Sequence, residues 1–326
     1  MSLFKMTASP HIHGDESTHT IMHDVIIALI PLVGWGIYAF GIRTLYVVAV
    51  SVISCVLSEY IYRKLLHKTN TIGDLSAVVT GILLALTLPV TVPLWVCAVG
   101  GIFAIVVVKQ LYGGIGKNVV NPALAARVFL FTAFPKYLSN FTSFGKSYGL
   151  ISNYESDVVA VAGATPLTQN ISEKGSLIDL FLGNHSGCIG EISELLIIIG
   201  GLYLLFRKVI TWHIPISFIG TVAIISFIFP LGGAQNLEFM LCELATGGLL
   251  IAAIFMATDY VTSPVTSNGR IIYGVGCGLI TAFIRYFGGY PEGVSFAILI
   301  MNLLVWYIDM FTRPRVFGGA KIVKSK

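Results

Sequence analysis

The segment FMATDYVTSP, Phe255–Pro264, decides the expected fold, because its polar and proline positions occur a second time in the chain. Thr258 stands three residues before VTSP at Val261–Pro264, as Thr87 stands three residues before VTVP at Val90–Pro93. A Gly pair follows each copy. Each copy therefore predicts a helix, a hairpin containing proline and a second helix. Chance likeness between short apolar segments is the alternative explanation.

Most of the chain is apolar enough to lie in a membrane. Of its 326 residues, 56% are hydrophobic and 11% are charged, and the mean hydropathy is +0.85. Soluble domains carry about 25% charged residues, and crossing a bilayer takes ~20 apolar residues. We predict an all-α polytopic membrane protein with about ten transmembrane helices, near 24–42, 44–62, 75–89, 93–111, 122–135, 190–206, 212–230, 240–258, 271–287 and 293–311.

Five spans precede the long polar interval and five follow it, so the second half is expected to be inverted in the membrane. Inverted repeats with helices interrupted by Pro or Gly are typical of transport folds, whose sites lie between the halves. We predict five parts: a cytoplasmic N-terminal segment 1–23, a first five-helix repeat 24–135, an extracytoplasmic loop 136–189, a second five-helix repeat 190–311 and a basic cytoplasmic tail 312–326.

The basic residues predict the orientation of the chain. Lys and Arg are expected to be confined to loops, with an excess in the cytoplasmic ones. With both termini cytoplasmic, fifteen of the 20 basic residues face the cytoplasm, and five face outward: Arg43, Lys136, Lys146, Lys174 and Arg285. The net charge of +4 therefore indicates topology rather than nucleic-acid binding.

Asp259 is the best candidate for an ion site. Acids within or near spans are costly to bury without a partner, and Asp259 lies at the repeated hairpin beside Thr258 and Thr262. Carboxylate and hydroxyl oxygens suit a small cation. Asp309 is a second candidate, for which an ion pair with Arg313 one turn further on is the alternative.

Glu59 and the five cysteines also have structural interpretations. Glu59 has the same two interpretations as Asp309, with Arg63 as its partner. The five cysteines form no C-x-x-C pair, so no iron–sulfur or zinc site is expected within this chain alone. They are predicted to be buried, although a cluster shared with another polypeptide stays open: Cys55, Cys97, Cys188, Cys242 and Cys277.

Two asparagines mark a candidate cofactor site. Asn118 ends the segment GGIGKN, which lacks the spacing of a P-loop and follows a membrane helix rather than a strand, so ATP binding is not expected. Asn121, followed by Pro122, is predicted to cap the next helix. A helix N-terminus inside a membrane cavity attracts an anion or a polar ring.

The motif GATPLT at Gly163–Thr168 lies within the polar interval. Small neighbours leave the Thr165 hydroxyl approachable, and Pro166 ends regular structure just after it. The motif is therefore interpreted either as an ordinary turn or as a site where a bulky group is attached.

Several long motifs together resemble a family of membrane subunits of redox-driven ion pumps. They are SPHI at 9–12, GGIGKNVVNPAL at 113–124, GATPLT, FMATDYVTSP and the tail from Arg285 to Gly318. In this order they resemble the RnfD/NqrB family, and within it the RnfD component of the Rnf complex, the ion-translocating ferredoxin:NAD oxidoreductase. The NqrB component of the sodium-translocating NADH:quinone reductase shares the pattern but is typically longer. The resemblance covers nearly the whole chain.

The resemblance implies that Thr165 carries FMN through a phosphoester from its Oγ, attached by a flavin transferase, within the motif that includes Gly163, Ala164 and Thr168. The family pattern is Ser/Thr-Gly-Ala-Thr, from which Ala162 departs. The resemblance also implies a second, noncovalent flavin (riboflavin), other Rnf subunits as partners, Na⁺ or H⁺ as the ion, and a place in the prokaryotic inner membrane. A fold similar to urea- and ammonium-type channels is implied too.

The leading hypothesis is a membrane subunit of a redox-driven ion pump that carries electrons between ferredoxin and NAD through FMN and is not active alone. A passive inverted-repeat transporter or channel is the first alternative, and a purely structural scaffold is the second. If the chain is a passive transporter, the GATPLT motif has no cofactor to carry and is only a turn.

Overall fold

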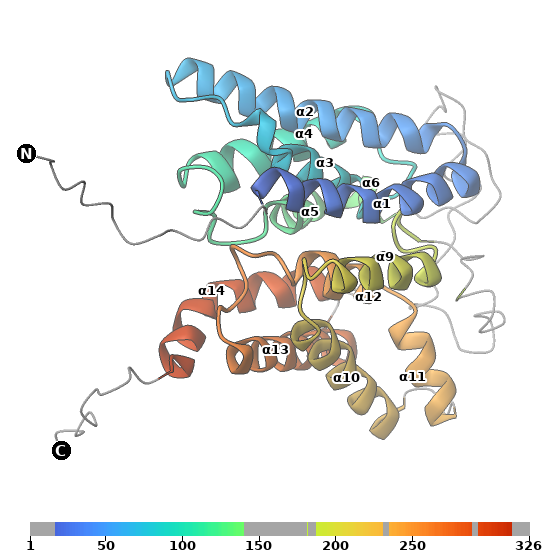
Figure 1. The fold of residues 1–326 in the computed structure, drawn as a ribbon. Helices are drawn as coiled ribbons and strands as arrows, with labels where there is room; N and C mark the ends of the chain where they lie inside the picture. The colour runs from blue at the N-terminus through green and yellow to red at the C-terminus, as the bar shows by residue number, and fades with distance from the viewer. Residues whose placement is uncertain (1–16, 140–180, 182–186, 231–234, 289–292, 315–326) are drawn as a thin grey trace, which may run out of the picture.

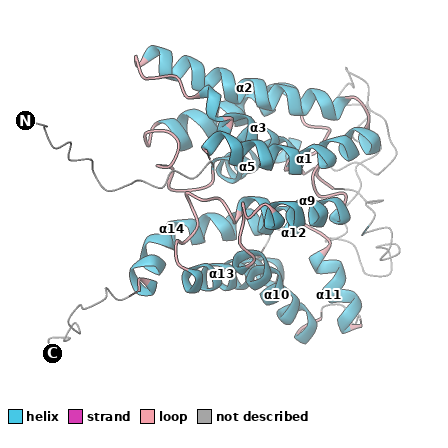
Figure 2. Cartoon of the chain, in the orientation of Figure 1, coloured by secondary structure: helices cyan, strands magenta, loops and turns pink. Residues whose placement is uncertain are grey.

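The computed structural model describes residues 17–139, 181, 187–230, 235–288 and 293–314. Within these ranges the chain folds into helices joined by loops (Figure 2). The residues 163–168 of the GATPLT motif lie outside the described ranges. The polytopic all-helical class expected from the sequence is confirmed.

The described helices fall into two halves, on either side of residues 140–186 (Figure 1). The first half contains α1 (Thr18–Phe40), α2 (Arg43–Leu65), η1 (Ile72–Asp74), α3 (Ser76–Leu86), α4 (Leu94–Ile102), the π-helix η2 (Phe103–Gln110), α5 (Pro122–Ala133) and α6 (Pro135–Leu138). The second half contains α9 (Glu194–Phe206), α10 (His213–Ile228), α11 (Asn236–Leu244), α12 (Leu249–Ile251), the π-helix η4 (Ala252–Met256), α13 (Ser267–Phe287) and α14 (Val294–Thr312). The repeated hairpin joins α3 to α4 in the first half and η4 to α13 in the second.

The chain enters and leaves the helical body at one end. In Figure 1, α1 begins and α14 ends toward the left, whereas α6 ends and α9 begins toward the right. The end of α6 and the start of α9 therefore lie opposite the start of α1 and the end of α14.

Helix length separates full spans from short ones. Among the described residues, four helices are long and apolar enough to cross a membrane, namely α1, α2, α13 and α14. The bent pair of α11 with α12–η4 has the length and composition of either a broken span or a re-entrant loop. Five shorter apolar helices accompany them. The 11 residues of α3 rise only about 16 Å, so α3 alone is too short to cross the ~30 Å hydrocarbon layer.

Side-chain caps set several helix starts. Ser17 accepts a hydrogen bond from Thr20 N at the start of α1, and Thr266 accepts one from Gly269 N at the start of α13. Asn121 accepts from Ala123 N and Leu124 N, with Pro122 in the first turn of α5. These bonds satisfy backbone N–H groups that have no partner within the helix.

The expected single helix at 240–258 is broken. Gly247 and Gly248 have positive φ angles of 70° and 65°, which glycine adopts without a steric penalty, and the chain bends by 59° between α11 and η4. Arg285 stabilises the bent backbone, because its guanidinium donates to the Glu243 carboxylate at 2.9 Å and to the Thr246 carbonyl at 2.9 Å. The first helix also begins earlier than the expected residue 24, at Thr18.

The expectation that Lys and Arg are confined to loops is wrong for several residues. Lys109 is 3% exposed within η2, and Arg43, Arg63 and Arg127 are also buried. Arg43 donates to the carbonyls of the first hairpin, at 2.9 Å to Val90 O. Basic side chains inside the helical body therefore satisfy backbone and carboxylate acceptors where helices are interrupted.

Lys208 provides a stability test of the local backbone. Its φ of 58° is left-handed, and the bond from Val209 N to Leu204 O at 2.9 Å closes the end of α9 around it. A side chain in this conformation costs about 1 kcal/mol, so Lys208→Gly is expected to raise the thermal unfolding temperature of the detergent-purified protein. Lys64→Gly, in the last turn of α2, is the matched control and should lower it. A lower unfolding temperature for Lys208→Gly would show that the left-handed conformation of Lys208 does not destabilise the protein.

Candidate functional site

A cavity of about 100 Å³ lies between the two halves. The first half contributes α1, α3, η2 and the segment 115–123, and the second contributes α9, residues 209–210, η4 and residues 258–261. Its wall is largely apolar, with polar side chains at Ser76, Lys109, Asn118, Asn121 and Asp259. A mostly apolar cavity with a few polar groups at a repeat interface is where transport folds place their sites.

Asp259 lies in the connection between η4 and α13, outside the helices themselves. Its carboxylate accepts hydrogen bonds from Thr262 Oγ1 at 3.2 Å and from Val261 N at 3.5 Å. Enclosure by the protein raises the pKa of this carboxyl, and the donors, Asn118 among them, oppose part of that rise. A raised pKa brings proton release closer to neutral pH, which suits a group that exchanges a proton or a cation.

Asn121 joins the two halves beside Asp259. While its side-chain oxygen caps α5, its Nδ2 donates to Met256 O in η4 at 3.1 Å. Asn302 of α14, in the amide orientation that satisfies its neighbours, accepts from Asn121 N at 3.1 Å and donates to Thr262 O at 3.1 Å. The start of α5 is thereby fixed to both sides of the second hairpin.

The structure brings most of the described candidates together. Thr258, Asp259, Asn118 and Asn121 line the cavity, and Thr262 is buried behind Asp259. Asp309 does not line the cavity, and its carboxylate accepts from Val265 N at 3.1 Å. The candidates Gly163, Ala164, Thr165 and Thr168 lie outside the described residues.

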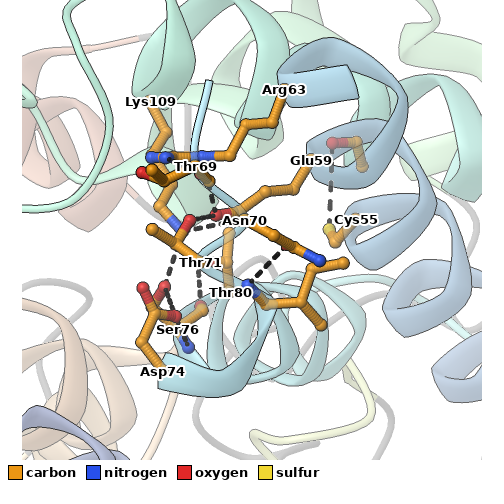
Figure 3. Close-up of polar contacts among 12 residues, drawn as sticks. Cys55, Glu59, Arg63, Thr69, Asn70, Thr71, Asp74, Ser76, Thr80 and Lys109 are labelled. Carbon is orange, nitrogen blue, oxygen red and sulfur yellow. Dashed lines mark hydrogen bonds and ion pairs between the residues drawn. The ribbon is translucent and has the colours of Figure 1, made fainter. Parts of the chain in front are cut away.

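Lys109 belongs to the site and was not among the sequence candidates. Its Nζ donates to Glu59 Oε2 at 2.8 Å and to Ser76 Oγ at 2.6 Å (Figure 3). A lysine near the end of an expected span is the signal that could have identified it, because intramembrane cations are rarely without a role. Lys109 was not identified because the topology prediction assigned all Lys and Arg residues to loops.

Glu59 has more partners than the sequence predicts. The expected pair with Arg63 is present at 3.7 Å, but Lys109 lies closer. Thr71 Oγ1 donates to Glu59 Oε1 at 2.6 Å, and Glu59 itself is 0% exposed. The carboxylate is therefore fully enclosed between two cations and a hydroxyl (Figure 3).

Apolar helices packed around a cavity that carries a carboxylate define a polytopic, all-helical membrane protein. The chain belongs to the NQR2, RnfD, RnfE family, whose family model matches residues 5–318.

Curated relatives match along almost the full chain. The D component of the Na⁺-translocating ferredoxin:NAD⁺ oxidoreductase complex of Acetobacterium woodii is 45% identical, with 98% of this chain and 97% of that one covered. The D component of the proton-translocating ferredoxin:NAD⁺ oxidoreductase complex of Clostridium ljungdahlii is 38% identical, with 97% of each covered. The D component of the ion-translocating oxidoreductase complex of Stutzerimonas stutzeri is 39% identical, with 95% and 96% covered.

Proposed function

We propose that the chain is a membrane subunit of a redox-driven ion pump that moves electrons between ferredoxin and NAD together with other subunits. Membership of the family and the names of relatives matched over their whole length support this function. A passive transporter would also use a cavity between inverted halves, but the named relatives favour the redox role. The Asp259 carboxylate in the wall of the cavity between the two halves is the structural observation that carries the transport half of the proposal.

Thr165 is the proposed attachment site for FMN, through a phosphoester made by a flavin transferase. FMN would supply one- and two-electron transfer at that tether. The proposal rests on the GATPLT motif and the small residues around the hydroxyl. We further propose that both termini are cytoplasmic and that the Thr165 loop lies outside the cytoplasm of a prokaryotic inner membrane. The separation of loop and termini is supported by α6 ending and α9 beginning opposite the start of α1 and the end of α14. The excess of basic residues assigned to the terminal side supports its direction.

The wall of the cavity is the proposed region for a second, noncovalent flavin, and the cavity of about 100 Å³ must widen to admit the ring. The amides of Asn118 and Asn121 can hydrogen-bond the polar edge of a flavin ring, and the apolar lining suits its body. The N-terminus of α5 adds a positive dipole end at the same place. The proposal is supported by the match between these donors, the apolar lining and the chemistry of a flavin ring.

Asp259 is the proposed ion ligand, with Thr258 and Thr262 beside it. Asp259→Asn is expected to lower the apparent affinity for the transported ion by roughly 10-fold or more, because contacts to a charged group contribute about 1.5–3 kcal/mol. Ion uptake driven by ferredoxin oxidation, in proteoliposomes holding the whole complex, measures the effect. Sodium and proton gradients are tested separately, since the same carboxylate can serve either ion.

Glu238→Gln at the first turn of α11 is the matched control, because Glu238 is acidic and does not line the cavity. It should leave uptake unchanged. Uptake by Asp259→Asn with the parent's ion affinity would remove Asp259 from the ion pathway.

A further inference from the structure

Asp24 ties the first half of the molecule to the second. This α1 residue is 6% exposed. Its carboxylate accepts from Tyr203 Oη of α9 at 3.0 Å. It also accepts from Arg207 Nε at 3.1 Å and lies 3.0 Å from Arg207 Nη2, directly after α9. Two donor groups of the second half thus hold one acid of the first.

This contact lies directly behind the wall of the inter-repeat cavity. Ile21 and Val25, one on each side of Asp24 along α1, line the cavity, as does Leu204 between Tyr203 and Arg207. Moving α1 away from α9 at this level would therefore separate two parts of the cavity wall.

The segment after α9 connects the same contact to the hairpin that carries Asp259. Tyr260 Oη donates to Val209 O, and Arg270 Nη1 donates to Thr211 Oγ1 at 3.1 Å. Arg270 Nε also donates to Pro264 O at 3.0 Å. Residues 207–211 are thus held on one side by α1 and on the other by the hairpin.

The two helices also have a close crossing further along. A Cβ on Gly200 of α9 would lie 2.9 Å from Ala28 O of α1 and 3.0 Å from Phe255 Cζ, so α9 approaches the α1 backbone this closely only because residue 200 has no side chain. Such a contact lets packed helices pivot with little rearrangement, whereas the Asp24 contact about one turn away along α1 must break.

We propose that Asp24, Tyr203 and Arg207 form a latch that holds the two halves together at the cavity, and that the latch opens when the cavity exchanges its contents with the adjoining aqueous phase. The inference rests on the proposed ion pump, since it assigns the latch to the cavity of Asp259. With the latch closed, Asp24 also positions residues 207–211 against the Asp259 hairpin.

Thiol accessibility tests the latch without any need for turnover. Thr80 of α3 lines the cavity and is 9% exposed, so Thr80→Cys reports on access to it, against a background of five buried native cysteines. The whole complex, in membranes, is treated with a water-soluble fluorescent maleimide. The labelling rate of the chain with Thr80→Cys is compared with that of the chain without it.

Asp24→Asn and Arg207→Gln are each expected to raise the labelling rate roughly 5- to 10-fold. The expected rise in labelling rate is smaller than the loss of a fully buried charged hydrogen bond would produce, because the Arg207 guanidinium is half-exposed to solvent. Lys208→Gln removes the adjacent charge, which does not contact Asp24, and should leave the rate unchanged. If the complex with Asp24→Asn does not assemble, the labelling rate of the complex with Arg207→Gln is the test of the latch.

Equal labelling rates for Arg207→Gln and the parent would overturn the latch, as would an equal rise with Lys208→Gln. Failure of the pump proposal shows in a different experiment, because Asp259→Asn is measured by ion uptake and the labelling rate needs neither electrons nor an ion gradient.

Discussion

Replacing Thr165 with alanine is expected to abolish covalent attachment of flavin to the chain. The phosphoester requires a side-chain oxygen, and alanine offers none, so the expected loss is complete rather than graded. Flavin fluorescence of the denatured protein on a gel, after expression with the flavin transferase, measures attachment. Ferredoxin-to-NAD electron transfer by the purified complex measures the consequence and should fall by orders of magnitude if the tether is an obligatory relay.

Thr168→Ala is the matched control for this experiment. It removes the other hydroxyl of GATPLT and leaves Thr165 in place, so the fluorescent band should persist. Ala162→Ser restores the family's preferred residue before Gly163 and is expected to keep or increase attachment. A fluorescent Thr165→Ala band would place the flavin elsewhere, and full electron transfer without the band would remove the tether from the relay.

Removing the Glu59 carboxylate is expected to be the most destabilising single change among the described helices. Glu59→Gln leaves the Lys109 ammonium and the Arg63 guanidinium buried without their shared counter-charge (Figure 3). Breaking a buried pair from one side costs about 3–5 kcal/mol. The expected result is a large fall in the thermal unfolding temperature in detergent and a low yield of assembled complex.

Lys109→Met tests whether the loss of stability in Glu59→Gln comes from breaking the ion pair between Glu59 and Lys109. It should destabilise less than Glu59→Gln, because Arg63 still balances Glu59. The double variant should lose less stability than the two single changes together, since each removes the group that the other leaves uncompensated. Glu238→Gln serves as the surface control. Additive losses in the double variant would mean that Glu59 and Lys109 act independently.

The sequence predicts the helices well, because hydropathy and caps are local properties. The expected span 122–135 begins at the residue where α5 begins, since Asn121 and Pro122 mark that start unambiguously. The break at Gly247–Gly248 was not predicted, because both flanking segments are apolar and a Gly pair is also common in unbroken membrane helices. Its cause is the backbone conformation that Arg285 stabilises from another helix.

The site is only partly predictable, because its contacts join distant segments. Asp259 could be singled out from the repeated hairpin, and Arg63 could be assigned to Glu59 because they lie four residues apart on one helix. Lys109 lies 50 residues from Glu59 and Arg207 lies 183 residues from Asp24. No local pattern indicates such pairs, which exist only once the halves pack against each other.

Intact-mass analysis of the purified protein, followed by peptide mapping of Val158–Lys174, tests the central claim most directly. The proposed function predicts one phosphoester-linked FMN per chain, located on Thr165, after expression with the flavin transferase. An unmodified mass under those conditions, or a flavin mapped to another residue, would contradict it.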